Sequence, residues 1–455
     1  MRAHYERMLE QRYRQRRWLL VTGVLAAATS LVGDLRRLGA GDLYVIAGSQ
    51  GAGPAPDVPS MVLDTGGADV MDSIRRFERV LGDLPAGVAA AVQAFDPDRA
   101  ARVIGTVFMG RDEVAGRPVH GARPPRWRAL DDKTTVDALW DAAGVARAPS
   151  LVVPAEAAAL RAASARLDVG AGVVWVADNR AGWHGGATGL RWVATPEQAH
   201  RAAAFLARQA HRVRVMPFLD GIPCSIHGMV FAGATAVFRP CEMIVLRRPG
   251  RSDLFYAGAG TTWDPPDARR AEMRDAARRV GEHLRATVGY RGVFTLDGVM
   301  TAEGFRPTEL NPRFGAGAGP LALAAGLPLY LLHLAVIEDP GAAWSPDRLE
   351  RLVVDAADGS RGVHGIAAVS GTLPEQEVRL RRDGDDLVEA GAQPAEVTLL
   401  TGSGPAGGAL RVTVDTAGHP AGQPVAPVIA AALSWADQQW DLGLGPLQPA
   451  PDVTA

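Results

Sequence analysis

Lysine is nearly absent from this chain. Of its 48 basic residues, one is a lysine, Lys133, and the other 47 are arginines. Cysteine is also scarce, because Cys224 and Cys241 are the two that the sequence contains. Two cysteines exclude a disulfide framework and a multi-cysteine metal site, so we expect both to be packed apolar residues in a cytoplasmic protein. The lone lysine has two interpretations at this point: chance, or a position that requires an ammonium group.

The chain also lacks an excess of charge of either sign. Its 48 basic and 50 acidic residues give a formal net charge of -2 at pH 7. This argues against nucleic acid as a partner, because proteins that bind it present a basic face to the phosphates. No apolar run is long enough to span a membrane. Residues 18–32, which follow Arg14, Arg16 and Arg17, resemble a signal peptide but are too short to cross a bilayer. We therefore expect neither a membrane nor nucleic acid among the partners.

The distribution of apolar and turn residues predicts three parts. Residues 1–128 alternate short apolar runs with amphipathic stretches, which is typical of an α/β unit with a parallel sheet. The proline-rich segment 116–128 is expected to be a linker. Residues 346–455 contain β-like runs and close with a helix at 427–440. Between these parts we expect strands at 173–176, 190–193, 213–218, 225–231 and 235–238, and helices at 131–143 (with Asp131 or Asp132 as N-cap), 196–209, 268–288 and 321–337.

A β-hairpin predicted at residues 292–315 carries the most informative side chains. Two alternating strands flank a short polar turn that ends in glycine. If the turn is centred near Glu303, Asp297 faces Glu309 across the ladder, and Asn311 shares their face by the period-2 rule. Two carboxylates and an amide oxygen suit Mg²⁺, whose shell is completed by water and substrate phosphates. The alternative is that the two carboxylates are ordinary exposed strand residues.

Three features together resemble the ATP-grasp superfamily of carboxylate–amine ligases. They are Asp297 in the hairpin, the run Glu309-Leu-Asn-Pro-Arg313 on its second strand, and the earlier stretch Asp132-Lys-Thr-Thr with Ala-Gly-Val145 after it. Hairpin, spacing and upstream lysine occur in the order that the superfamily has. The resemblance covers about residues 131–340.

The resemblance implies an α/β chain with the ATP-grasp fold, in which two α+β subdomains grip ATP. Residues 1–128 would then form an N-terminal α/β pre-ATP-grasp domain. The ATP-grasp domain would occupy residues 129–345, with its lid subdomain at about 150–212. Residues 346–455 would form a small C-terminal β-rich domain that ends in a helix.

The resemblance also assigns roles to the residues that carry it. In that superfamily the Asp, Glu and Asn hold two magnesium ions that bridge the β- and γ-phosphates, so Asp297, Glu309 and Asn311 are the expected metal ligands, with Mn²⁺ as a substitute. Arg313 corresponds to an arginine that faces the developing acyl phosphate. Lys133 corresponds to a lysine that contacts the nucleotide phosphates. We expect these two to be the catalytic residues, because phosphoryl transfer to a carboxylate depends mainly on positioning and charge neutralisation.

Nucleotide contacts are implied at two further segments. The glycine-rich stretch 182–189 lies between two strands, where the superfamily has a loop that closes on the phosphates, and glycine N–H groups can cradle oxygens without hindrance. His184 in this loop is either a substrate or phosphate contact or an exposed histidine. Segment 215–225 resembles the hinge where adenine pairs with backbone groups. The expected nucleotide-binding residues are Lys133, Gly182, His184, Gly185, Gly186, Met216, Pro217, Phe218 and Arg239.

The chain departs from the superfamily at one nucleotide contact. The strand before the glycine loop usually carries a second lysine, whereas residues 173–177 contain none. Arg180, Arg191 and Arg239 are the candidates for this charge, although an arginine fork needs a different geometry. Arg239, together with Glu242, forms either a substrate or phosphate contact or a structural ion pair.

The layout as a whole looks like the stand-alone ATP-grasp peptide ligases of actinobacterial secondary metabolism, with the pheganomycin type as the nearest. It implies an enzyme of antibiotic biosynthesis: ATP phosphorylates a carboxylate, an amine attacks the acyl phosphate, and an amide, ADP and phosphate are released. The partners would be ATP, Mg²⁺ and small-molecule or peptide acids and amines, and a homodimer is one expected assembly. Three alternatives stay open: a small amine in place of a peptide, an ATP-dependent kinase on this fold, and a non-catalytic nucleotide-binding protein.

Overall fold

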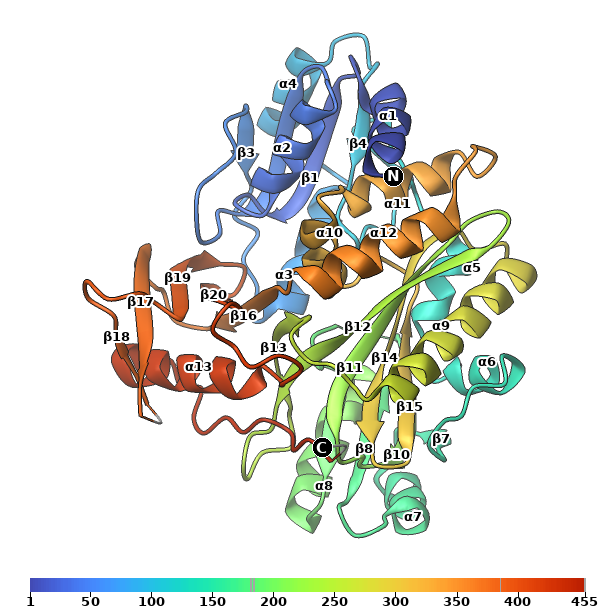
Figure 1. The fold of residues 1–455 in the computed structure, drawn as a ribbon, viewed down its shortest axis with the longest axis vertical. Helices are drawn as coiled ribbons and strands as arrows, with labels where there is room; N and C mark the ends of the chain where they lie inside the picture. Colours follow the sequence, from blue (N-terminus) through green and yellow to red (C-terminus); the bar gives the residue numbers. More distant parts are fainter. Residues whose placement is uncertain (181, 183–184, 385, 454–455) are drawn as a thin grey trace.

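The computed structural model describes residues 1–180, 182, 185–384 and 386–453. Three sheets of four or more strands organise this part of the chain: one near the N-terminus, a small one in the middle, and a ten-stranded sheet that includes the C-terminal strands. Figure 1 shows the N-terminal sheet at the top, the small sheet at the bottom and the C-terminal strands at the left. The chain therefore has the mixed α/β architecture expected from the sequence.

The N-terminal sheet is parallel, with the strand order β3-β2-β1-β4. The apolar run 18–32 forms the interior strand β1 and the start of helix α2, and Trp18 is fully buried. Its continuous apolar character follows from burial on both faces, as is usual for parallel strands. The elements are α1 (Arg2–Tyr13), β1 (Trp18–Val24), α2 (Ala28–Arg37), β2 (Leu43–Ser49), β3 (Ser60–Val62), α3 (Val70–Val80), α4 (Ala86–Phe95) and β4 (Arg102–Ile104).

Segment 116–128 is packed, so the expectation of a linker was wrong. Arg117 is 2% exposed, and its Nε donates to Asp96 Oδ2 at 2.9 Å. The Trp127 ring packs against Tyr290 with centroids 5.0 Å apart. The prolines interrupt helices and strands in this segment, but side chains between them form contacts with buried residues elsewhere in the chain. The sequence pattern does not show these contacts because the partners are distant. The elements are β5 (Glu113–Val114), β6 (Arg117–Pro118), α5 (Pro125–Arg128) and α6 (Val136–Ala142).

The middle sheet is antiparallel, with the order β7-β10-β8-β9. Helices α7 and α8 pack on one face, around the buried Leu160, Trp175 and Leu206. A separate apolar cluster lies on the opposite face. The strands and the helix expected in this region are confirmed as β8 (Val173–Ala177), β9 (Leu190–Val193), β10 (Arg212–Pro217) and α8 (Pro196–Gln209), joined by β7 (Leu151–Pro154) and α7 (Ala157–Leu167).

The large sheet has the order β15-β14-β11-β12-β13-β16-β20-β19-β17-β18. Its C-terminal strands continue the central ones through the β13–β16 pair, where Gly258 lies opposite Gly365. A Cβ at Gly258 would meet the carbonyl oxygen of His364 at 2.0 Å, so this close pairing requires glycine. The elements are β11 (Ile222–Val230), β12 (Thr235–Leu246), β13 (Phe255–Gly260), α9 (Asp267–Thr287), β14 (Gly292–Thr301), β15 (Gly304–Asn311), α12 (Pro346–Gly359), β16 (Val363–Val369), β17 (Gln376–Asp383), β18 (Asp386–Glu389), β19 (Val397–Gly404), β20 (Gly407–Val414) and α13 (Ala426–Trp440).

The apolar helix expected at 321–337 is two helices, α10 (Ala318–Ala325) and α11 (Leu329–Glu338), bent by 102°. Gly326 adopts φ 58° and ends α10, and Pro328 precedes α11, so two stop signals outweigh the apolar pattern. Both helices contribute to the large core beneath the N-terminal sheet. In the part of the chain that is described, no single helix is long and apolar enough to cross a membrane, although this bent pair reaches the necessary length and composition.

Helix α6 begins later than expected, at Val136 instead of near Asp131. Asp132 does not cap it, since its Oδ1 accepts the N–H of Thr134 at 2.9 Å in a tight turn. Asp131 is drawn away by an ion pair with Arg313. A distant cationic partner has therefore outweighed the capping preference of an aspartate.

Candidate active site

The β14–β15 hairpin has the predicted register. Asp297 lies opposite Glu309, and a bulge follows between Asp297 and Gly298. Asn311 lies two residues beyond Glu309, and its Nδ2 donates to Asp297 Oδ2 at 2.6 Å. The three side chains expected to bind metal therefore share one face of the sheet.

Lys133 reaches this face from the segment before α6. Its Nζ lies 3.1 Å from Glu309 Oε1 and donates to Asn311 Oδ1 at 3.1 Å and to the carbonyl oxygen of Leu310 at 2.8 Å. The residue is 4% exposed. The three protons of the ammonium group thus match three oxygens on consecutive residues, so the lone lysine and the hairpin form one cluster.

The chemistry of this cluster fits a divalent cation. Burial and the neighbouring Glu309 carboxylate raise the pKa of Asp297 to about 7, and Lys133 opposes this increase. Closely spaced carboxylates with a perturbed pKa gain from an added positive charge, and an all-oxygen donor set suits Mg²⁺. Among the described residues, no group of three or more His, Cys, Asp or Glu side chains lies close enough to hold a metal ion. The set at the hairpin differs from such groups because its third donor is the amide oxygen of Asn311.

Arg313 lies at the end of the hairpin and is 8% exposed. It forms an ion pair with Asp131, and its guanidinium stacks over the Phe108 ring at 5.3 Å. Arg123 shares the same carboxylate at 3.4 Å and also donates to the carbonyl oxygen of Pro312 at 3.0 Å. Asp131 was expected only as a candidate helix cap and Arg123 had no expected role, because their partners are distant in the chain. Two arginines around one aspartate leave a net positive charge beside the cluster of Lys133, Asp297, Glu309 and Asn311.

A glycine-rich turn after Arg313 adds unpaired donors. No hydrogen bond of the described chain engages the N–H groups of Gly315, Ala316 and Gly317. Neither ring nitrogen of the fully buried His227 has a partner among the residues that the structure describes, and a Cβ on Gly315 would lie 3.0 Å from its Nε2. Burial lowers the pKa of His227 to about 3, so the ring is neutral. The repeated Gly-Ala-Gly-Ala-Gly sequence at 315–319 was the available signal for this turn.

The inner face of the middle sheet, opposite helices α7 and α8, carries an apolar cluster. The buried Val174, Val176 and Met216 belong to its cluster, and Trp192 stacks on Phe218 at 4.2 Å between centroids. Strand β7 pairs with β10 only as far as Val215, so the edge of β10 beyond it has no partner from β7. This edge includes the expected hinge residues Met216 and Pro217. An apolar face beside an open backbone edge can accept a flat heterocycle.

The glycine loop is partly described. Gly182 and Gly186 adopt φ 92° and 57°, conformations that favour glycine. Gly185 lies in the described part of the loop, and the expected contact His184 lies outside the described residues. A Cβ on Gly182 would lie 3.6 Å from Arg75 Cδ, so helix α3 of the N-terminal unit borders the loop. The loop connects β8 to β9, at the end of the middle sheet.

Arg239 lies apart from this cluster, in an ion-pair network. It is 1% exposed, pairs with Asp264 and Asp358, and donates from Nη2 to two backbone carbonyls at 3.0 Å. Glu242 is bound elsewhere, since its Oε2 accepts the Val425 N–H at 2.6 Å. Of the two alternatives left open by the sequence, these contacts favour the structural one for Arg239.

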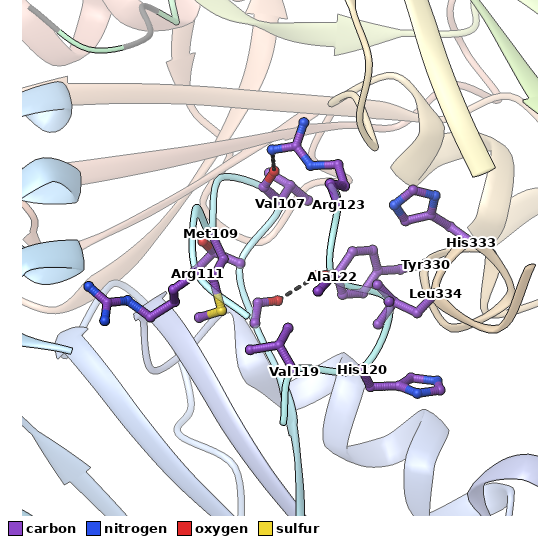
Figure 2. Close-up of a pocket in the computed structure, with 13 residues that line it drawn as sticks. Val107, Met109, Arg111, Val119, His120, Ala122, Arg123, Tyr330, His333 and Leu334 are labelled. Carbon is purple, nitrogen blue, oxygen red and sulfur yellow. Dashed lines mark hydrogen bonds between the residues drawn. The ribbon is translucent and has the colours of Figure 1, made fainter. Parts of the chain in front are cut away.

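A pocket between the N-terminal unit and α11 contains none of the predicted site residues. Figure 2 shows Arg123 and His333 on one side of it, with His120 at the other end. Tyr330 closes it by donating to the carbonyl oxygen of Gly105 at 2.5 Å. Arg123, which lines this pocket, donates to the carbonyl oxygen of Pro312 and so supports the segment that carries Arg313.

Solved structures share the fold of this chain at low sequence identity. An ADP complex of N5-carboxyaminoimidazole ribonucleotide synthetase has 13% identity and a TM-score of 0.50, over 94% of this chain and 98% of that one. N5-carboxyaminoimidazole synthase from Aspergillus clavatus, in complex with ADP and 5-aminoimidazole ribonucleotide, has 11% identity and a TM-score of 0.51, over 94% and 99%. Rhizobium etli pyruvate carboxylase has 15% identity and a TM-score of 0.55; the match covers 93% of this chain but 37% of that one. No family model and no curated protein matches the chain. The chain has the ATP-grasp fold.

Proposed function

We propose that this chain is an ATP-dependent ligase that joins a carboxylate to an amine through an acyl phosphate. One observation carries the proposal: Lys133 and the three oxygen ligands Asp297, Glu309 and Asn311 meet on one sheet face. This face adjoins a basic pair of arginines and an apolar face that can hold a base. Phosphoryl transfer to a carboxylate needs these elements together.

Asp297, Glu309 and Asn311 would hold Mg²⁺, which neutralises charge on the transferred phosphoryl group when bound. Lys133 binds phosphate oxygens, and its flexible stem lets the ammonium move from Glu309 to the nucleotide. The adenine would lie on the apolar face of the middle sheet and pair with the open edge of β10. Support comes from the two synthetase structures of the same fold that contain ADP.

The substrate carboxylate would lie at Arg313 and the turn 315–317. Arg313 neutralises the carboxylate and then the acyl-phosphate oxygens, and the unpaired N–H groups of the turn can donate to the same oxygens. The neutral ring of His227 packs behind the turn, so it supports the turn from the side away from the proposed substrate. The amine attacks the acyl carbon and phosphate leaves, so the protein itself supplies no covalent nucleophile.

We further propose that the amine is a peptide N-terminus and that the product is a peptide-type natural product. Its support is the sequence resemblance to the stand-alone peptide ligases. The test is a screen of acid and amine pairs for ADP release, followed by mass spectrometry of the products. Amide formation that requires both substrates supports a ligase, and a peptide preferred over single amino acids supports the narrower proposal. ADP release with a phosphorylated hydroxyl and no amine requirement would show a kinase instead.

A further inference from the structure

The proposed nucleotide site lacks one cation that the ATP-grasp resemblance implies. Strand β8 carries Val176 and its neighbours where a second lysine is usual. Of the three arginines considered from the sequence, Arg239 is bound in the network described above. Arg191 lies opposite Trp175, so it points toward the helix-covered face, and its guanidinium stacks on Phe205 at 3.7 Å. Arg180 is exposed in the loop after β8. None of the three lies on the inner face of the sheet.

Arg214 lies on that inner face, beside strand β8, where the resemblance implies the second lysine. In the β8–β10 ladder it is directly opposite Val176, and paired residues of an antiparallel ladder project to the same side. It is 1% exposed although it is charged. Its Nη1 donates to the carbonyl oxygen of Thr308, the residue before Glu309, at 3.0 Å. The guanidinium therefore lies between the apolar face and the proposed metal cluster.

The contacts of Arg214 hold it in place and leave part of its donor capacity unused. Asp137 of α6 fixes one side, with Nε and Nη2 at 3.0 and 2.7 Å from its Oδ1. A guanidinium has five N–H groups. In Arg214 one N–H of Nη1 is directed at the weak acceptor Met216 Sδ, 3.3 Å away. Of the two protons on Nη2, one is donated to Asp137 and the other has no partner in the described chain. A phosphate oxygen is a much stronger acceptor than a thioether. A phosphate group can therefore replace the thioether at Nη1 and use the remaining Nη2 proton.

We propose that Arg214 binds a phosphate group of the nucleotide in place of the missing lysine, and that Asp137 positions it. The positive charge would then lie on β10, the strand adjacent to β8, and the arginine would reach the phosphate site that the resemblance assigns to a lysine on β8. This inference rests on the proposed nucleotide binding, and it concerns the phosphates rather than the base.

The test compares MgADP with adenosine by titration calorimetry on the full chain. Arg214→Met should weaken MgADP binding at least about tenfold, the loss expected for a hydrogen bond to a charged group, and should affect adenosine much less. Arg191→Met, on the opposite face of the same sheet, is the matched control and should change neither affinity. Failure of the wild-type chain to bind MgADP would reject the proposed function; unchanged MgADP affinity in Arg214→Met, or equal losses for both ligands, would reject only the role of Arg214.

A rescue experiment separates charge from packing. Adding Val176→Lys to Arg214→Met returns a cation to β8 and should restore most of the MgADP affinity, whereas no recovery in a folded double variant would contradict the proposal. If Arg214→Met does not fold, Arg214→Gln combined with Asp137→Asn keeps a hydrogen-bonded pair without charge. The same selective loss of MgADP affinity is expected from that pair of changes.

Discussion

Replacing Lys133 with arginine tests why one lysine remains in a chain of arginines. Lys133 is 4% exposed, and its ammonium lies within 3.1 Å of three oxygens on residues 309–311. A planar guanidinium is larger and spreads its donors in one plane, so it cannot replace an ammonium that serves three converging acceptors. Lys133→Arg should therefore displace the hairpin and lower both stability and ADP release.

The magnitude follows from these contacts. Overpacking a buried site costs about 1–3 kcal/mol, which is the loss expected for Lys133→Arg. Lys133→Met leaves two buried acceptors, Leu310 O and Asn311 Oδ1, without a donor, at about 1–3 kcal/mol each. The ion pair with Glu309 adds little more, because that carboxylate is 30% exposed and water screens it. We expect a loss of about 3 kcal/mol for the methionine variant.

Urea unfolding in EDTA measures the stability without metal, and ADP release with Mg²⁺ measures activity. Arg212→Lys is the matched control, since Arg212 lies 3.6 Å from Asp132 with a 52% exposed side chain, and its exchange should change stability by less than about 0.5 kcal/mol. Wild-type stability and full ADP release in Lys133→Arg would refute the argument and leave chance as the reason for the lone lysine.

Three further predictions concern other parts of the site and fold. Asp297→Asn and Glu309→Gln should each lower ADP release at least about a hundredfold, given the several kcal/mol that a metal contributes, and unchanged turnover would contradict the metal assignment. Burial raises the pKa of Glu242 from 4.5 to about 7, so the folded state binds the proton more tightly than the unfolded one. The protonated carboxyl therefore contributes its full stabilisation below pH 4.5, and this contribution is lost as pH rises to about 7. The free energy of unfolding of the wild type, measured with urea between pH 5 and 8, should fall by about 3 kcal/mol because of this group. Glu242→Gln should remove this pH dependence, and an equal pH dependence in the wild type and the variant would refute the argument. Gly315→Ala brings a Cβ to 2.4 Å from a side-chain oxygen and should lower the thermal midpoint, whereas Gly319→Ala meets nothing within 4 Å and should not.

The hairpin was predictable because its determinants are local. The turn fixes the register, and the register with the period-2 rule fixes which side chains share a face. Asp297, Glu309 and Asn311 span fifteen positions of one continuous segment. Lys133 was found through the order of motifs in the resemblance rather than through geometry.

The partners of the arginines were not predictable, since they depend on tertiary packing. Arg214 binds Asp137, 77 positions away, and Arg313 binds Asp131, 182 positions away. No periodicity in the sequence relates such residues. Long-range contacts changed two local expectations: Asp131 pairs with Arg313 and does not cap α6, and segment 116–128 is packed by Arg117 on Asp96 and Trp127 on Tyr290.

The arginine excess and the missing second lysine have a common physical explanation. Arg214 is proposed to serve as a cation with Asp137 at one edge of its guanidinium and the Thr308 carbonyl at Nη1, contacts that suit a planar fork. At position 133 three oxygens on consecutive residues converge on one nitrogen atom, which suits the compact ammonium of lysine. Strand β8 carries Val176 opposite Arg214, so the proposed phosphate contact comes from the neighbouring strand. The variants at positions 133 and 214 therefore test whether the geometry of the acceptors, and not chance, decides which cation each position carries.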